Sequence, residues 1–237
     1  MNVRIFEIFT SIEGEGIFYG TKTLFVRLAG CPFTCFYCDT KESLPLDSGK
    51  EFSIEDAITE IGSQIQSNTF KVNFTGGDPL LQHQAVALLA KNIQDRKIPT
   101  YLESSCFDVD RFNHVLPFID YIKIEFKTRE SEFVDIQHYE KLISESLKCL
   151  ESSINQQKIT YIKIVVSSKT KITDFNNLVE NIFKIRNSEK ISGFIIQPTY
   201  GISEPSLEQL MEMYDCVFPK FRDVKIVPQL HKFIGAP

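Results

Sequence analysis

Three cysteines in a short segment are the clearest chemical signal in this sequence. Cys31, Cys35 and Cys38 form the pattern Cys-Pro-Phe-Thr-Cys-Phe-Tyr-Cys, and the other cysteines of the chain are widely separated. A structural zinc site would need a fourth ligand, often from a second Cys or His pair, and no such pair follows. Three thiolates can hold three irons of a 4Fe-4S cluster and leave the fourth iron open to a ligand. The spacing therefore favours an iron-sulfur cluster over zinc.

Glycines gather in the same part of the chain. Eight of the 11 glycines fall in the first 77 residues, and Gly76-Gly77-Asp78-Pro79 directly follows a strand-like run. Glycine allows the backbone to turn tightly or to approach a ligand closely. The chemistry is therefore expected in the N-terminal third.

The composition limits the class of protein. The chain has 237 residues, a formal net charge of -5, 20 Phe and 8 Tyr, which is typical of a soluble globular protein. Its apolar runs are far shorter than the roughly 20 residues that span a bilayer. The first ten residues carry no secretory signal pattern, so we expect a cytoplasmic protein without disulfides. The basic residues are scattered among acids, which argues against direct binding of nucleic acid.

Strand-like and helix-like segments alternate along the chain. Runs rich in β-branched and aromatic residues predict strands at 23–28, 71–75, 99–103, 121–125, 160–167, 193–197 and 223–227. Apolar stripes at helical spacing predict helices at 54–65, 81–96, 108–116, 136–150, 178–185 and 206–216, and 41–51 is interpreted as a polar loop. Alternation predicts parallel βα units, with ligands at the carboxyl ends of the strands.

The length also constrains the fold. A barrel of eight βα units typically takes about 250 residues, so this chain is slightly short for one. We predict one α/β domain over residues 1–237, an incomplete barrel of the (β/α)6 type.

The cysteine spacing resembles that of the radical S-adenosylmethionine (SAM) superfamily. In that superfamily SAM binds the open iron of the cluster, and its reductive cleavage supplies a 5'-deoxyadenosyl radical. Tyr37 matches the aromatic position that lies against the adenine. The Gly76-Gly77-Asp78-Pro79 segment is similar to the Gly-Gly-Glu-Pro element that binds the methionine amino group, with Asp78 in place of Glu.

A narrower resemblance covers nearly the whole chain. The segments 7–16 (Glu-Ile-Phe-Thr-Ser-Ile-Glu-Gly-Glu-Gly), 24–31 and 227–232 (Val-Pro-Gln-Leu-His-Lys), with Asp39-Thr40 after the last clustered cysteine, resemble the 7-carboxy-7-deazaguanine synthase family. The resemblance implies conversion of 6-carboxy-5,6,7,8-tetrahydropterin to 7-carboxy-7-deazaguanine with loss of ammonia, on the route to queuosine or archaeosine. It also implies Mg²⁺, a flavodoxin or ferredoxin-type electron donor and a homodimer.

The resemblance carries over to individual positions. Cluster ligands would be Cys31, Cys35 and Cys38, and Thr40 would bind Mg²⁺. SAM contacts would be Tyr37, Cys38, Asp39, Gly76, Gly77, Glu103, Ser105, Glu125, Phe126, Lys127, Gln197, Pro198, Thr199 and Tyr200. Substrate contacts would be Ile12, Glu13, Gly14, Arg27, Thr75, His231 and the terminal Pro237. Glu13 stands where the family usually has Gln, and Phe126 and Lys127 depart in part from the common Ser-Pro-Lys form.

Several of these residues have a structural alternative. Thr40 could cap a helix or turn. Arg27 could pair with an acid such as Glu15 instead of a substrate carboxylate. The hydroxyl of Ser105 could cap the strand end, and His231 could contact only the tail. The three remaining cysteines, Cys106, Cys149 and Cys216, are interpreted as small buried hydrophobes.

Two other functions remain open at this point. A glycyl-radical activating enzyme would share the small size and the cysteine triplet, but its substrate is a protein. A zinc-stapled βα module used only for binding would not be an enzyme.

Overall fold

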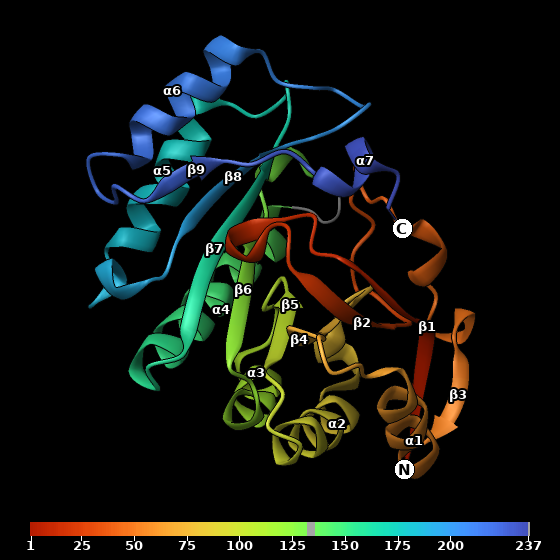
Figure 1. Ribbon diagram of the computed structural model, residues 1–237. Helices are drawn as coiled ribbons and strands as arrows, with labels where there is room; N and C mark the ends of the chain where they lie inside the picture. Colours follow the sequence, from red (N-terminus) through yellow and green to blue (C-terminus); the bar gives the residue numbers. More distant parts are fainter. Residues whose placement is uncertain (132–135, 237) are drawn as a thin grey trace.

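The computed structural model describes residues 1–131 and 136–236. Its nine strands form one sheet in the order β3-β1-β2-β4-β5-β6-β7-β8-β9 (Figure 1). Seven strands run parallel: β2 (Lys22–Leu28), β4 (Lys71–Gly76), β5 (Thr100–Ser104), β6 (Tyr121–Phe126), β7 (Ile159–Val166), β8 (Phe194–Pro198) and β9 (Val224–Ile226). These are the seven predicted strands, and each end lies within one residue of the prediction.

Two further strands extend one edge of the sheet. β1 (Asn2–Ile12) pairs antiparallel with β2, and β3 (Lys50–Ser53) pairs antiparallel with β1. Neither was predicted, and β3 overlaps the end of the segment interpreted as a polar loop. Only two residues of β1 are fully buried, Val3 and Ile5, so most of this strand lacks the alternation that identifies a half-buried strand.

Helices follow the parallel strands and complete six βα units. They are α1 (Ile54–Gln64), α2 (His83–Asp95), α3 (Val109–Val115), α4 (Ile136–Asn155), α5 (Ile172–Phe183) and α6 (Leu207–Val217). A short α7 (Leu230–Ile234), which was not predicted, lies near the C-terminus. Short 3-10 turns occur at η1 (Gly16–Phe18), η2 (Lys41–Ser43), η3 (Leu46–Ser48), η4 (Pro79–Gln82), η5 (Leu116–Phe118), η6 (Arg129–Ser131) and η7 (Ser188–Lys190).

Side-chain capping explains where several helices begin. Ser53 accepts a hydrogen bond from the Asp56 backbone N–H at the start of α1. Ser206 accepts in the same way from the N–H of Gln209, so that α6 starts where the sequence predicts.

The sheet does not close on itself. β3 lies at one edge and β9 at the other, and no pairing joins these edges in the part of the chain that the structure describes. The predicted incomplete barrel of six βα units is confirmed, with β9 as a short additional strand. In Figure 1 the α1–α6 helices lie on the outside of the curved sheet, and α7 lies near its open end. None of the described helices has the length and apolarity needed to cross a bilayer.

The two faces of the sheet have different cores, because alternate side chains of a strand point to opposite faces. Under the helices lies the main core, which includes the fully buried Val72, Phe74, Leu102, Ile122, Ile124, Ile162, Ile164 and Ile196. A smaller cluster of Tyr101, Tyr161 and Ile195 fills the inner face. The segment after β1 closes this cluster with Ile17 and Phe18, and Figure 1 shows this red segment against β6 and β7.

Candidate active site

A cavity of about 780 Å³ opens at the carboxyl ends of the parallel strands. That volume lies within the roughly 300–1,000 Å³ range of pockets that hold drug-sized ligands. The cavity is lined by 22 of the residues predicted from the sequence: Ile12, Glu13, Gly14, Arg27, Cys31, Cys35, Tyr37, Cys38, Asp39, Thr40, Thr75, Gly76, Gly77, Glu103, Ser105, Glu125, Lys127, Gln197, Pro198, Thr199, Tyr200 and His231.

 Every predicted site residue inside the described ranges thus lines this one cavity, apart from Phe126.

The two remaining predicted residues are Phe126 and Pro237. The Phe126 side chain is fully buried in the main core under the helices, so only its backbone can approach a ligand, and its assigned SAM contact stays a prediction. Pro237, assigned to the substrate, lies outside the described residues.

The three clustered cysteines lie on the loop that follows β2. Its start is fixed by hydrogen bonds from Gly30 N–H to Ser43 O (2.8 Å) and from Cys31 N–H to Leu44 O (3.0 Å). All three thiols are free and line the cavity. Burial, with the nearby Asp78 carboxylate, raises the pKa of Cys31 to about 12, so a bound metal must supply the charge that stabilises its thiolate.

The donor set fits an iron-sulfur cluster better than a single metal ion. In the described part of the chain, no three His, Cys, Asp or Glu side chains are gathered around a single metal position. A cluster takes each thiolate on a different iron, so its ligands need only face a common space, as Cys31, Cys35 and Cys38 do.

Gly76 and Gly77 place the end of β4 directly against the start of the cysteine loop. Gly76 has a φ of +130°, and a Cβ there would lie 2.2 Å from the Leu28 carbonyl oxygen. A Cβ on Gly77 would lie 2.1 Å from the carbonyl oxygen of Gly30. Only glycine fits this approach, which gives both residues a structural role besides the predicted contact with SAM.

Asp78 has a structural role that the sequence did not reveal. Its Oδ1 accepts from Leu80 N–H (3.1 Å) and from Ser104 Oγ (2.8 Å), while Oδ2 accepts from the N–H (3.0 Å) and Oγ (2.6 Å) of Ser105. The carboxylate, 2% exposed, thereby joins the turn after β4 to the end of β5. The Ser105 hydroxyl donates to this carboxylate, so it has a structural role at the end of β5, as the alternative to a SAM contact suggested.

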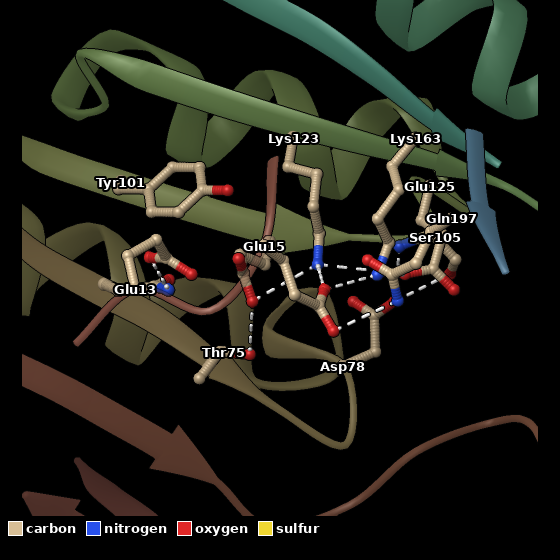
Figure 2. Close-up of polar contacts among 12 residues, drawn as sticks. Glu13, Glu15, Thr75, Asp78, Tyr101, Ser105, Lys123, Glu125, Lys163 and Gln197 are labelled. Carbon is tan, nitrogen blue, oxygen red and sulfur yellow. Dashed lines mark hydrogen bonds and ion pairs between the residues drawn. The ribbon is translucent and has the colours of Figure 1, made fainter. Parts of the chain in front are cut away.

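Alternating charges cover the inner face of the sheet above the tyrosine cluster. Figure 2 shows Glu15, Lys123, Glu125 and Lys163 pointing toward one another. Lys163 Nζ lies 2.6 Å from Glu15 Oε2 and 3.0 Å from Glu125 Oε2. Lys123 Nζ lies 3.2 Å from Glu103 Oε2 and 3.8 Å from Glu125 Oε2. Glu15 and Glu125 therefore share Lys163, and Glu103 and Glu125 share Lys123.

Sequence reasoning missed Lys123 and Lys163 as site residues. Both occupy the middle of strands whose neighbouring side chains are apolar, and both are about 5% exposed or less. A lysine in such a strand needs a buried partner. Its presence among apolar residues could therefore have identified both lysines from the sequence.

Glu15 links the N-terminal segment to three other parts of the chain. Besides Lys163, its carboxylate accepts from Nε2 of Gln197 (3.1 Å) and from Nε2 of Gln229 (2.9 Å). Burial alone would raise the pKa of Glu15, but Lys163 and Lys123 lower it to about 2. Glu15 is thus a fixed negative charge in the site.

Two buried oxygens in the site have no hydrogen-bond partner among the described residues. They are Glu103 Oε1 and Gln197 Oε1, and both residues line the cavity. Because buried polar atoms are normally hydrogen-bonded, these acceptors suit a ligand with N–H or O–H groups.

Arg27 pairs with an acid, but not with the one named from the sequence. Its Nε donates to Glu7 Oε1 at 2.6 Å, across the β1–β2 pairing that sets the two residues opposite each other. Its guanidinium also lies over the Phe9 ring, 5.4 Å from the centroid. The suggested partner Glu15 was wrong, because Glu15 is bound by lysines and glutamines. Arg27 still lines the cavity and retains further N–H donors.

Thr40 does not use its hydroxyl as a cap. It precedes η2 without a side-chain capping bond, and its carbonyl oxygen accepts from Ser43 instead. The Thr40 hydroxyl lies 4.0 Å from Cys38 Sγ. The capping alternative is therefore wrong, and the hydroxyl remains open to a ligand.

The C-terminal segment covers one side of the cavity. His231 Nε2 and Lys232 Nζ each lie 3.6 Å from Asp39 Oδ2, and Gln229 Nε2 donates to the same oxygen at 3.3 Å. Burial would raise the pKa of Asp39, but these groups hold it well below the ordinary range. His231 thus contacts the residue next to the last cluster cysteine as well as lining the cavity.

Comparison with known proteins identifies relatives of this chain. Residues 12–159 match a family described as a 4Fe-4S single cluster domain. The chain is 31% identical to the 7-carboxy-7-deazaguanine synthase of Archaeoglobus fulgidus, over 99% of both chains. It is 32% identical to the protein of the same name from Methanocaldococcus jannaschii, over 97% of this chain and 98% of that protein.

Solved structures share the fold. QueE from Escherichia coli has a TM-score of 0.69 at 20% identity, covering 98% of this chain and 95% of that chain. A radical SAM methyltransferase from Sphaerobacter thermophilus has a TM-score of 0.65 at 10% identity, covering 88% of this chain and 66% of that chain.

These matches favour an iron-sulfur enzyme over the zinc-stapled module. The family match implies a 4Fe-4S cluster as a cofactor, and the solved structures share the fold. With relatives that are more than 30% identical over almost the full length, this chain belongs to the 7-carboxy-7-deazaguanine synthase family.

Proposed function

We propose that this chain converts 6-carboxy-5,6,7,8-tetrahydropterin to 7-carboxy-7-deazaguanine with release of ammonia. It would act as a carbon-nitrogen lyase on the route to the 7-deazapurine bases of tRNA. The observation that carries the proposal is that the cysteine triplet and the predicted substrate residues face one cavity, in a chain whose full-length relatives are named for this synthase.

The chain's own residues fit the binding of both cofactors. Cys31, Cys35 and Cys38 would hold the cluster, and the cluster and SAM, when bound, supply a radical that takes a hydrogen atom from the substrate. The unpartnered oxygens of Glu103 and Gln197 would accept hydrogen bonds from the amino or hydroxyl groups of SAM. The Gly76-Gly77 segment would bring its backbone close to the methionine end.

Other residues would bind and orient the pterin. Arg27 keeps donors for the substrate carboxylate beyond the one that Glu7 uses. Glu13, Gly14 and Thr75 would contact the ring from the N-terminal segment and the end of β4. The covering segment of Gln229 and His231 would exclude water from the reacting atoms.

The proposal includes a magnesium ion, a partner and an electron source. Thr40 would bind Mg²⁺ through its hydroxyl, which makes no capping bond, since Mg²⁺ prefers oxygen ligands and keeps several waters. A flavodoxin or ferredoxin-type protein would reduce the cluster, and the enzyme would act as a cytoplasmic homodimer.

One incubation tests this function. The enzyme is reconstituted with iron and sulfide without oxygen, reduced, and mixed with SAM, Mg²⁺ and 6-carboxytetrahydropterin. We expect a deazapurine product and none from the Cys35→Ala variant. Formation of 5'-deoxyadenosine without any deazapurine would show that the substrate is a different one, such as the protein substrate of a glycyl-radical activating enzyme.

A further inference from the structure

We infer that Lys71 is a positioning residue for the substrate: its buried ammonium holds the Glu13 carboxylate so that a free oxygen accepts hydrogen bonds from the pyrimidine N–H groups of the pterin. The inference rests on the proposed function, because it takes the pterin as the ligand. It concerns a lysine that lies behind the cavity wall and does not line the cavity itself.

The ammonium group of Lys71 is buried among partners that oppose the cost of its burial: burial lowers the pKa of Lys71, and the Glu13 carboxylate raises it. Lys71 begins β4 and is fully buried. Its Nζ donates to Glu13 Oε2 (2.7 Å) and to Thr23 Oγ1 (2.6 Å), and it lies 4.9 Å from the ring centroid of Tyr101 and 5.4 Å from that of Phe18. A lysine is buried in this way only when its charge is paired. The pair therefore fixes the position of both side chains.

Glu13 connects this buried lysine to the cavity. Its side chain is 3% exposed, and the residue lines the cavity wall. The hydrogen bonds from Lys71 and from Asn73 Nδ2 (3.4 Å) both fall on Oε2. Among the described residues, Oε1 accepts no hydrogen bond, so this oxygen is the one available to a ligand.

The charge of Glu13 depends on this lysine. The titratable and charged groups that face Glu13 are Lys71 on β4, Glu103 and Tyr101 on β5, Lys123 on β6 and Tyr161 on β7. Burial and the Glu103 carboxylate raise the pKa of Glu13 to about 7, against the opposing effect of Lys71 and Lys123. Loss of the Lys71 charge would raise this pKa further, and a protonated Glu13 would present one acceptor fewer to the N–H groups.

The test measures pterin binding without turnover. The reconstituted enzyme with its cluster and SAM is left unreduced, and the Kd for 6-carboxytetrahydropterin is measured by calorimetry between pH 6 and pH 9. We expect Lys71→Met to weaken binding about tenfold at pH 7, as for the loss of one charged hydrogen bond. We also expect the midpoint of the pH dependence to move to higher pH.

Two further variants separate the charge from simple packing. Glu13→Gln should remove the pH dependence near 7, and adding Lys71→Met to Glu13→Gln should cost little more, because no carboxylate remains to be held. Thr23→Val removes a neutral partner of the ammonium and should keep the pH dependence. Lys141→Met, at an exposed lysine, serves as the matched control.

The outcomes distinguish this inference from the proposed function. A wild-type enzyme that holds its cluster and SAM but does not bind the pterin would overturn the proposed function. A wild-type enzyme that binds the pterin, with a Lys71→Met variant of unchanged Kd and pH dependence, would overturn the role of Lys71. If Lys71→Met does not fold, a Glu13→Gln variant that keeps the wild-type pH dependence near 7 would also overturn the role of Lys71.

Discussion

Glu15 and Lys163 form an ion pair of 2.6 Å although 148 positions separate them in the sequence. Gln197 and Gln229 donate to the same carboxylate, so the N-terminal segment, β7, β8 and the C-terminal segment meet at one group. The inner face of the barrel is therefore organised by long-range charge pairing, whereas the outer face is organised by apolar packing under the helices.

Replacing Lys163 by methionine should destabilise the protein. The change removes the cation nearest to Glu15 and leaves only the more distant Lys123 shared between Glu15 (3.7 Å) and Glu125 (3.8 Å), and breaking a buried pair typically costs about 3–5 kcal/mol. For a chain of this size each kcal/mol lowers Tm by roughly 2–4 °C. Anaerobic calorimetry of the cluster-loaded protein measures the shift. Lys141→Met should change Tm little, and a Lys163→Met variant as stable as that control would contradict the role of the pair.

The Glu15→Gln variant should show a stability deficit that depends on pH. The folded-state pKa of Glu15, about 2, lies below the ordinary 4.5, because Lys163 and Lys123 outweigh the effect of burial. A lowered carboxyl pKa stabilises the folded state above the unfolded value, and this contribution is lost as the pH falls from 4.5 toward 2. Denaturant unfolding at several pH values should show a smaller deficit at pH 3 than at pH 7. An equal deficit at both would be inconsistent with a carboxylate held charged.

Alanine at Gly76 should disrupt the cysteine loop. The new Cβ would lie 2.2 Å from the Leu28 carbonyl oxygen and 2.4 Å from the Leu28 nitrogen, so the end of β4 must move away from Leu28, which leads into the cysteine loop. We expect little bound iron and a lower Tm. Gly20→Ala is the matched control, because Gly20 also has a positive φ, +86°, but has open space at the Cβ position. If both variants retain iron equally, the close packing of the loop on β4 is not required.

Removal of the Thr40 hydroxyl should weaken the binding of Mg²⁺. The hydroxyl makes no capping bond, so Thr40→Ala should leave Tm and iron content nearly unchanged while raising the Mg²⁺ concentration needed for half-maximal activity. Thr40→Ser, which keeps a hydroxyl, should restore the wild-type value. A Thr40→Ala variant with unaltered magnesium dependence would locate the ion elsewhere.

The fold could be predicted to the extent that it depends on local pattern. The seven parallel strands and six main helices have regular apolar spacing and capping residues such as Ser53 and Ser206, and the structure confirms that these elements exist. The predicted bounds were wrong for α5, which begins at Ile172 and not at 178, and for α4, which continues to Asn155 and not to 150. β1 was missed because most of its residues are only partly buried, and α7 was missed because five residues are too few to show a helical period.

The site, too, could be predicted only where it depends on residues close together in the sequence. The three cysteines lie close to one another in the sequence and the two glycines are consecutive. Each group could therefore be identified from its residue types and spacing. The pairing of Arg27 with Glu7, of Glu15 with Lys163 and of Glu13 with Lys71 depends on strand register and on the path of the segment after β1. Sequence alone shows that such charges need partners, but it does not show which partner each one meets.

The ratio of product formed to SAM consumed tests the central claim most directly. The reduced wild-type enzyme is incubated with SAM, Mg²⁺ and excess 6-carboxytetrahydropterin, and mass spectrometry measures 7-carboxy-7-deazaguanine and 5'-deoxyadenosine. We propose that the abstracted hydrogen atom is returned and SAM is regenerated, and we therefore predict that many molecules of 7-carboxy-7-deazaguanine form for each SAM lost. Accumulation of 5'-deoxyadenosine with no 7-carboxy-7-deazaguanine would contradict it.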